Sequence, residues 1–139
     1  MNIRLAREHD IEIVECFFKD HLHPDNQAVY SGEFLCPSGV RAAIKRRQVI
    51  VAEDGELIVA ALRFYLRKRD KTASLYQFAI KEGFRRRGLL RMMLQLIGET
   101  KVISLCPQDI PFNDYYRKTG WTLLKSDATF NYWEFLPRG

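Results

Sequence analysis

The stretch FAIKEGFRRRGLLRMML, residues 78–94, joins a β-rich run to an apolar helical run through three arginines and Gly88. A strand that ends in a turn and opens a helix presents free backbone N–H groups at that turn. Those groups and the helix dipole favour an anion, and a phosphate or pyrophosphate fits best. A glycine in the first helical turn costs about 1 kcal/mol relative to alanine, and a close approach of ligand to backbone is one reason to keep it.

Positive charge is concentrated around this stretch. Between residues 63 and 91, ten Lys or Arg side chains stand against two acids, in a chain whose net charge is +5. This asymmetry predicts an anionic partner for the middle of the chain, but not which one. Taken alone, the arginines at 85–87 and 91 fit a phosphate cradle, a solvated turn or a nucleic-acid surface.

The composition is that of an ordinary soluble globular protein, with 47% apolar and 28% charged residues. The length of 139 residues predicts one domain with its own core. There is no apolar run near the roughly 20 residues that span a bilayer, and no signal-peptide region at the start. We therefore expect a cytoplasmic protein without a membrane partner. The cysteines show no pairing pattern and the histidines no metal-ligand pattern, which predicts reduced thiols and no metal site: Cys16, Cys36, Cys106, His9, His21 and His23.

Hydrophobic periodicity upstream of the opening stretch predicts a strand, two helices and three further strands. The strands are expected at 2–6, 48–53, 56–66 and 73–80, and the helices within 7–22 and over 38–47, with a loop at 24–38 between them. Ser38 is the expected N-cap of the second helix. Asp54-Gly55 is expected to form the hairpin turn between the second and third strands.

Downstream, the pattern predicts a helix over 88–98, a strand at 101–105 and a short helix within 107–121. Asp109 is the expected cap of that helix, Pro111 fits its first turn and Gly120 ends it. Two strands about Asp127 close the chain. The result is an α/β fold: a mixed central sheet flanked by helices on both faces, antiparallel in the middle, with a right-handed crossover through 86–98.

Four motifs in the same order resemble those of the GCN5-related N-acetyltransferase (GNAT) superfamily. IRLAREHD resembles the opening of the family, and VAEDGELIVAALRF its central hairpin. Residues 85–90 match its cofactor loop, in which Arg or Gln, two residues, Gly, one residue, and Gly or Ala follow a strand. PQDIPFNDYYRKTGW is similar to its closing segment. The resemblance implies the acyl-CoA N-acyltransferase fold, with residues 1–139 as a single N-acetyltransferase (GNAT) domain.

The resemblance also implies an N-acyltransferase that moves acetyl from acetyl-CoA (coenzyme A) to a primary amine by direct attack. In that activity, main-chain groups on the strand before the loop bind the pantetheine arm, and the N–H groups of the turn hold the pyrophosphate. Tyr116, four residues before Gly120, is implied to protonate the departing thiolate. The cofactor-binding residues implied are Phe78, Ala79, Ile80, Arg85, Arg86, Arg87, Gly88, Leu89, Leu90, Arg91 and Asn113.

Two positions depart from the family pattern. Leu90 occupies the final small-residue position, where only a main-chain N–H is required, although its side chain could crowd the phosphates. Asp109 stands where many members have Asn, and Asn113 could partly substitute for it. No general base is assigned, because the central strand offers Gln77, which accepts a proton poorly. The candidates by residue type are Glu33, Glu53, His21 and His23, and a water chain would also serve.

Two other functions remain open. One is a GNAT-fold protein that binds coenzyme A as a sensor without catalysis. The other is a nucleic-acid-binding module that uses Lys68, Arg69, Lys71 and residues 85–87. The sequence argues against that module, because the arginines lead directly into a buried helix.

The acceptor stays open between a small-molecule amine and a protein or peptide amine. Residues 21–38 and 124–132 are expected to shape its site, where Asp25 and Glu33 would attract a cationic amine. A homodimer is compatible with the resemblance, since dimers are common among similar proteins.

Overall fold

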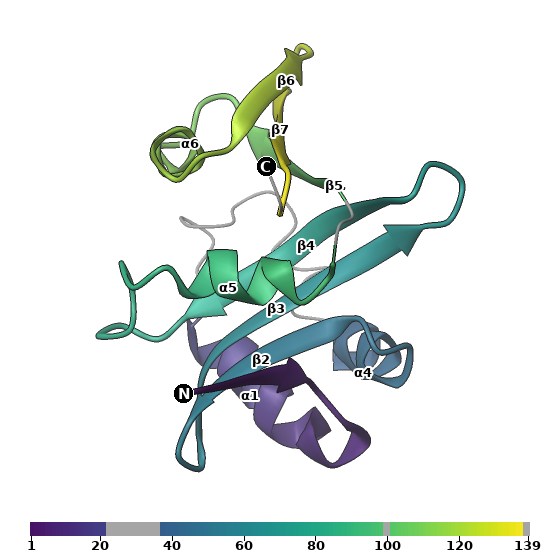
Figure 1. Ribbon diagram of the computed structural model, residues 1–139, viewed down its shortest axis with the longest axis vertical. Coiled ribbons are helices and arrows are strands. Elements are labelled where there is room, and N and C mark those ends of the chain that lie inside the picture. The colour runs from purple at the N-terminus through teal and green to yellow at the C-terminus, as the bar shows by residue number, and fades with distance from the viewer. Residues whose placement is uncertain (22–36, 99–100, 138–139) are drawn as a thin grey trace.

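The strands form one mixed sheet in the order β1-β2-β3-β4-β5-β7-β6 (Figure 1). The computed structural model describes residues 1–21, 37–98 and 101–137. β4 and β5 are parallel, and the other neighbouring strands are antiparallel. The strands are β1 (Asn2–Leu5), β2 (Val49–Asp54), β3 (Leu57–Arg67), β4 (Thr72–Ile80), β5 (Lys101–Pro107), β6 (Thr122–Ser126) and β7 (Phe130–Phe135). The helices are the 3-10 helix η1 (Glu8–Asp10), α1 (Ile11–His21), α4 (Pro37–Lys45), α5 (Leu89–Gln95) and α6 (Phe112–Lys118).

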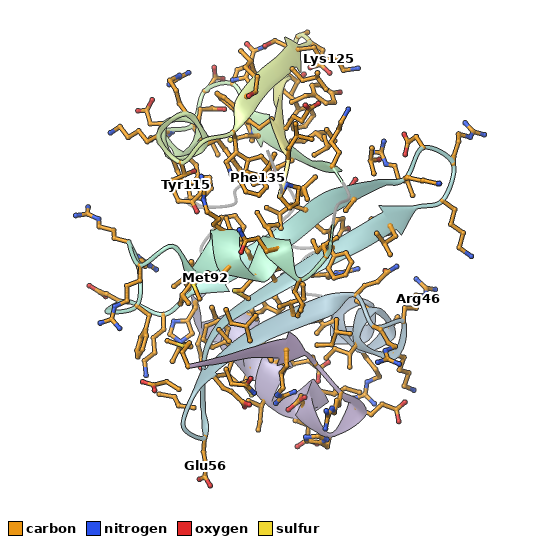
Figure 2. The ribbon with its side chains drawn as sticks, in the orientation of Figure 1. Arg46, Glu56, Met92, Tyr115, Lys125 and Phe135 are labelled. Carbon is orange, nitrogen blue, oxygen red and sulfur yellow. The ribbon has the colours of Figure 1, made fainter. Side chains whose placement is uncertain are left out.

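Helices cover both faces of the sheet, as the sequence predicted. Side chains alternate along β2, so that Val49 and Val51 pack with α1 and α4 in one buried cluster. Ile50 and Ala52 point the other way and pack with α5. Figure 1 shows α1 behind the sheet and α5 in front of it. Polar side chains such as Glu56 and Lys125 project from the rim (Figure 2). In the described ranges, no helix is both long enough and apolar enough to span a membrane.

Two predicted boundaries are wrong by one residue. Ser38 is not an N-cap, because α4 already includes Pro37. A proline suits a first helical turn, where its missing N–H would have no partner. In the β2–β3 hairpin Asp54 pairs with Leu57, so the turn is Gly55-Glu56. Gly55 adopts the left-handed conformation with φ +64, and Asp54 stays in the ladder.

The predicted cap of α6 is also wrong. Pro111 occupies the N-cap position, with no side-chain hydrogen bond to the first turn. Asp109 is exposed in the loop before the helix and does not cap it. The other end agrees with the prediction: Gly120 follows the C-cap with φ +92, a conformation that a glycine adopts without strain.

A β-bulge in β4 separates the two halves of the sheet. Arg63 of β3 pairs with Gln77 and the next residue pairs with Leu75, so Tyr76 is the extra residue. A bulge bends its strand and raises its twist. Beyond it β4 leaves β5: the two strands pair only over residues 72–74 and 101–103. Figure 1 shows β4 and β5 diverging from that short contact.

An ion-pair network ties the N-terminal strand to η1 and β2. The Arg4 guanidinium donates to both carboxylate oxygens of Asp10, at 2.8 and 3.0 Å, and through Nε to Glu53 at 3.0 Å. Asp10 also accepts the Arg7 backbone N–H at 2.7 Å. These hydrogen bonds, that of Arg4 above all, lower the pKa of the buried Asp10 carboxyl to about 2.

We expect Asp10→Asn to lower the free energy of unfolding by about 2 kcal/mol at pH 7. Because the folded-state pKa is depressed, the carboxylate contributes its full stability above about pH 4 and loses it as the pH falls toward 2. The difference between wild type and variant, measured by urea unfolding, should therefore shrink over that range. Glu8→Gln, which removes an exposed carboxylate nearby, is the control. A difference that persists unchanged at pH 2 would contradict the role given to Asp10.

Candidate functional site

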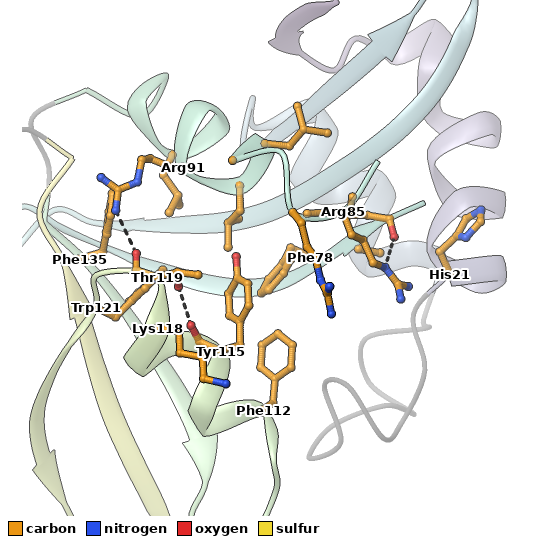
Figure 3. Close-up of a pocket in the computed structure, with 17 residues that line it drawn as sticks. His21, Phe78, Arg85, Arg91, Phe112, Tyr115, Lys118, Thr119, Trp121 and Phe135 are labelled. Atoms are coloured by element: carbon orange, nitrogen blue, oxygen red, sulfur yellow. Dashed lines mark hydrogen bonds between the residues drawn. The ribbon is translucent and has the colours of Figure 1, made fainter. Parts of the chain in front are cut away.

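A pocket of about 490 Å3 lies between the end of β4, helix α5 and helix α6 (Figure 3). It reaches side chains on both faces of β4, since Phe78 belongs to the cluster under α5 and Ala79 to the cluster under α1. The rim is cationic, and no carboxylate is among the described lining residues. The lining residues are His21, Phe78, Ala79, Ile80, Arg85, Arg86, Gly88, Leu89, Leu90, Arg91, Leu94, Phe112, Tyr115, Lys118, Thr119, Trp121 and Phe135.

The main chain of β4 turns polar groups toward this pocket. The Lys81 N–H donates to the Val59 carbonyl at 2.8 Å, which places residue 81 in a hydrogen-bonded pair with β3. In an antiparallel ladder such pairs alternate, so the N–H and C=O groups of Phe78 and Ile80 point away from β3. The Ile80 carbonyl accepts a hydrogen bond from Arg85 Nε at 3.0 Å instead. Phe78 and Ile80 thus present a half-free strand edge where β5 has moved away.

The loop between β4 and α5 contains three left-handed residues. Gly83 has φ +95, Arg86 has φ +65 and Gly88, the N-cap of α5, has φ +72. Alternation of right- and left-handed residues turns successive N–H groups to one side, a geometry that favours anions. The conformation of Gly88 is thus a structural reason for glycine at this position, because a side chain there strains the backbone.

Leu90 and Arg87 are both predicted to bind the cofactor, but only Leu90 lines the pocket. Leu90 lines the pocket but is 3% exposed, and its side chain packs in the core cluster under α5, so it does not protrude from the loop. Arg87 does not line the pocket, and its guanidinium lies 4.9 Å from the centre of the Phe84 ring.

An aromatic wall closes the pocket on the α6 side. The Phe112 and Tyr115 rings stack with their centres 4.9 Å apart, and Phe78 contacts both, at 5.6 and 6.0 Å. Burial raises the pKa of the Tyr115 phenol to about 12, with opposing effects from Thr119 and Arg91. Tyr115 therefore stays protonated at every pH at which the protein would normally be assayed, and it can act as a hydrogen-bond donor.

Tyr116, the predicted acid, does not line the pocket. Its side chain is 3% exposed, and its hydroxyl is 2.7 Å from Ser104 Oγ on β5. The ring packs between Trp121 and Trp133, and burial raises the pKa of the phenol well above its usual value. A general acid must come within hydrogen-bonding reach of the leaving group. In this geometry Tyr116 has no contact with the pocket, whereas its neighbour Tyr115 lines it.

Asn113, predicted to contact the cofactor, makes hydrogen bonds that hold together the loop before α6 and strand β7. Its amide nitrogen donates to the carbonyls of Pro107, Gln108 and Ile110 at 2.8 to 3.3 Å. Its amide oxygen accepts from Asn131 Nδ2 and Trp133 Nε1 at 3.0 and 2.9 Å. The side chain is buried and outside the pocket, with both of its polar atoms occupied. The sequence motif marks the position but not the side of α6 on which the residue lies, and the cofactor role of Asn113 stays a prediction that its described contacts do not support.

Arg91 crosses from α5 to the end of α6. Its guanidinium donates to the Thr119 carbonyl at 3.0 Å and lies 5.3 Å from the centre of the Phe135 ring (Figure 3). A Cβ on Gly120 would come within 2.7 Å of this guanidinium. Gly120 therefore both ends the helix and leaves room for the contact, which joins the two sides of the pocket.

The candidate bases lie in different places. His21, the last residue of α1, lines the pocket, and its ring centre is 4.4 Å from that of Phe17. Glu53 is held by Arg4 and Asn2 away from the pocket. Glu33 and His23 lie outside the described residues, as do Asp25 and most of the segment predicted to shape the acceptor site.

Sequence reasoning missed the apolar wall contributed by α6 and β7. Phe112, Tyr115 and Thr119 lie three and four residues apart, a spacing that places side chains on one helix face. That periodicity, applied to 112–119, would have separated the pocket face from the core face that carries Asn113 and Tyr116. The contribution of Phe135 has no local signal, because it depends on β7 pairing with β5.

Chains of known structure share this fold along nearly their whole length. The PaiA N-acetyltransferase of Thermoplasma acidophilum, solved with coenzyme A, is 13% identical with a TM-score of 0.76, over 97% of this chain and 98% of that one. A GNAT-family acetyltransferase of Listeria monocytogenes is 12% identical with a TM-score of 0.76, over 97% and 94%. The diaminobutyrate acetyltransferase EctA of Paenibacillus lautus, in complex with L-2,4-diaminobutyric acid and coenzyme A, is 14% identical with a TM-score of 0.67, over 98% and 94%.

No protein-family model matches the chain, and no curated protein matches it in sequence. The likeness is therefore one of structure. The chain has the acyl-CoA N-acyltransferase fold of the GNAT superfamily, which confirms the fold expected from the four motifs.

The hydrogen bonds of Asn113 predict a loss of stability rather than of binding. Asn113→Ala should lower the free energy of unfolding by about 3 kcal/mol or more, because it leaves three carbonyls and the Trp133 N–H without their partner. Asn113→Asp keeps the volume but cannot donate, and should be nearly as destabilising. Urea unfolding measures this loss. If the chain binds acetyl-CoA, calorimetry well below the melting temperature should find that affinity changed by less than about threefold. Unchanged stability with weakened binding would restore the cofactor role.

Proposed function

We propose that this chain is an acyl-CoA-dependent N-acyltransferase that transfers acetyl from acetyl-CoA to a primary amine. The observation that carries the proposal is the half-free edge of β4, where Phe78 and Ile80 turn main-chain groups into a pocket that ends at the arginine loop. A pantetheine arm carries two amides, which an exposed strand edge binds as it would bind an added strand. The fold, shared with acetyltransferases solved with coenzyme A, supports the same activity.

The cationic rim suits the diphosphate end of this cosubstrate. Arg85, Arg86 and Arg91 line the pocket beside the left-handed loop. Arginine donates to phosphate oxygens in a planar, bidentate manner, and it is always charged. A carbonyl oxygen has two lone pairs, so that of Ile80 can accept from a pantetheine amide while it keeps the hydrogen bond from Arg85 Nε. The terminal nitrogens of Arg85 take no part in that bond and can donate to a phosphate.

The reaction needs little covalent help from the protein. The amine nitrogen attacks the thioester carbonyl, a C–N bond forms, the C–S bond breaks, the amine loses a proton and the thiolate gains one. Holding the two reactants together makes the attack effectively unimolecular. We assign the stabilisation of the leaving thiolate to Tyr115, whose phenol belongs to the pocket wall and stays protonated. A fixed donor aimed at developing charge is the form of help that an electrostatic site provides.

Acetyl-CoA at micromolar concentrations should raise the melting temperature of the protein. Binding to the folded state alone stabilises it by about 2.7 kcal/mol when the ligand is at 100 times its Kd. S-acetyl-N-acetylcysteamine carries the same thioester without the diphosphate and is the control, with little or no shift expected at equal concentration. The proposed cosubstrate is excluded if neither acetyl-CoA nor coenzyme A shifts the melting temperature or gives heat in calorimetry.

Thiol release from acetyl-CoA against a panel of amines then tests turnover. The panel should include diamines, amino acids, aminoglycosides and peptides with a free N-terminus or lysine. At least one amine should raise thiol release above the rate of hydrolysis, with acetyl appearing on its nitrogen by mass spectrometry. Binding of acetyl-CoA without turnover of any amine would leave a coenzyme A sensor in place of an enzyme.

Two adjacent phenols give a matched pair of variants for the acid. Tyr115→Phe should lower kcat tenfold or more, since general-acid groups contribute about 100-fold or more, and should change acetyl-CoA affinity little. Tyr116→Phe loses the hydrogen bond to Ser104 and should cost about 1 kcal/mol of stability with kcat nearly unchanged. Steady-state kinetics and urea unfolding of both variants separate the roles. The reverse pattern, with Tyr116→Phe inactive and Tyr115→Phe active, would return the acid role to Tyr116.

A further inference from the structure

Apart from Arg63, which donates to Gln77 in the middle of the sheet, the basic side chains between residues 63 and 91 divide into two groups at opposite ends of β4. One group surrounds the loop that leads into α5, beside the pocket. The other lies at the tip of the β3–β4 hairpin, before β4 begins. β4 has nine residues, which separates the two ends by roughly 30 Å. Figure 1 shows the hairpin tip and the loop before α5 on opposite sides of the molecule.

The hairpin group is enlarged by the end of α4. The Phe64 N–H donates to the Gln48 carbonyl at 3.0 Å, so the chain just before residue 48 runs beside the strand that leads to the tip. Figure 2 shows Arg46 on the same side of the molecule as the tip. We call this set the hairpin patch. Its members, all exposed, are Arg46, Arg47, Arg67, Lys68, Arg69 and Lys71.

The charges of the hairpin patch are only partly compensated within the part of the chain that the structure describes, where the Asp70 carboxylate at the tip interacts electrostatically with Arg67. None of its six cations takes part in an ion pair there. The carboxylate at the tip, Asp70, accepts hydrogen bonds from the backbone N–H and hydroxyl of Thr72, at 3.2 and 2.7 Å. Repulsion among six like charges disfavours such a surface in isolation, and an anionic partner would relieve it.

An exposed aromatic ring lies beside one of these cations, Arg67. Tyr65 is 47% exposed and, two residues from Arg67 along β3, points to the same face of the strand. Its ring meets the Tyr76 ring edge to face, with centres 5.8 Å apart, which holds it in place. Cations that follow a phosphate backbone, next to a ring on which a base stacks, are the two elements of single-strand binding. An anionic membrane or an acidic protein surface would use the charge but not the ring.

We propose that the hairpin patch binds single-stranded nucleic acid, with its cations on the phosphates and Tyr65 stacked on a base. RNA and DNA share this chemistry, and both are used as probes below. The patch is independent of the proposed function, because it lies at the far end of β4 from the pocket. It also differs from the surface considered from the sequence, which joined residues 68–71 to residues 85–87.

The test is fluorescence anisotropy with a labelled 15-nucleotide oligouridylate and its deoxyuridylate counterpart, which differ only in the sugar. If all six cations meet phosphates, the slope of log K against log salt should approach about −4. The triple variant Lys68→Gln, Arg69→Gln, Lys71→Gln should weaken binding at least tenfold and reduce the slope by about 2. Tyr65→Ser should weaken binding about fivefold or more, with the slope unchanged. RNA bound in preference to DNA would identify the sugar as a further contact.

The matched control is Arg85→Gln, Arg86→Gln, Arg87→Gln at the other end of β4, which removes the same charge. It should keep nucleic-acid binding and lose acetyl-CoA affinity, and the hairpin triple should do the opposite. Saturating acetyl-CoA should not displace the oligonucleotide from wild type. If the hairpin triple does not fold by circular dichroism, Arg46→Gln, Arg67→Gln replaces it.

Four results would overturn the proposal. They are no binding at 50 mM salt, equal loss in the two triple variants, displacement by acetyl-CoA, and binding to phosphatidylserine vesicles but to neither oligonucleotide. Failure here leaves the acetyl-CoA experiments untouched, and failure of those leaves this test valid.

Discussion

The separation of β4 from β5 is the constraint on which the rest of the structure depends. Backbone N–H and C=O groups that leave one ladder need another partner, because an unpaired buried group costs as much as a lost hydrogen bond. β4 pairs with β5 over three residues and then runs on without it, so among the described residues the main-chain groups of Phe78 and Ile80 on that side meet no strand. Arg85 occupies the Ile80 carbonyl, and the pocket forms beside the remaining groups. A pocket thus follows from an incomplete sheet.

An incomplete sheet needs other contacts to hold its halves at a fixed distance. Arg91 supplies one, from α5 to the Thr119 carbonyl at the end of α6. Asn113 supplies another within the second half, because its hydrogen bonds lock the β5–α6 loop to β7. Since a rotation of α6 would turn Tyr115 and Tyr116 together, the same amide also determines which phenol faces the pocket. Rigid support of this kind is what a site needs if its donor is to act on developing charge.

The sequence predicted the fold well because its signals are local. Periodicity in 78–94, the breaks at Gly55 and Gly120 and the alternation in the hairpin all act over a few residues. The loop before α5 could be predicted for the same reason, whereas the role of the strand edge at 78–80 came only from the resemblance to GNAT proteins. Other features of the site depend on long-range geometry, which the sequence does not show. The motif assigns Asn113 to the cofactor, yet its hydrogen-bond partners Asn131 and Trp133 are about 20 residues away on β7. The four-residue spacing to Gly120 pointed to Tyr116. The rotation of α6 about its own axis, relative to β5, decides which of the two tyrosine rings is buried.

The arrangement of the basic residues also depends on long-range geometry that the sequence does not show. Along the chain the cations of 63–91 form one basic segment, whereas in space the long β3–β4 hairpin divides them. The two groups lie roughly 30 Å apart, and the Debye length at 0.1 M salt is about 10 Å. Each group therefore acts on anions at its own end with little effect on the other. If the arginines beside the pocket bind a diphosphate, the hairpin cations have little effect on that binding. The net charge of the segment therefore does not determine how many anionic partners it has.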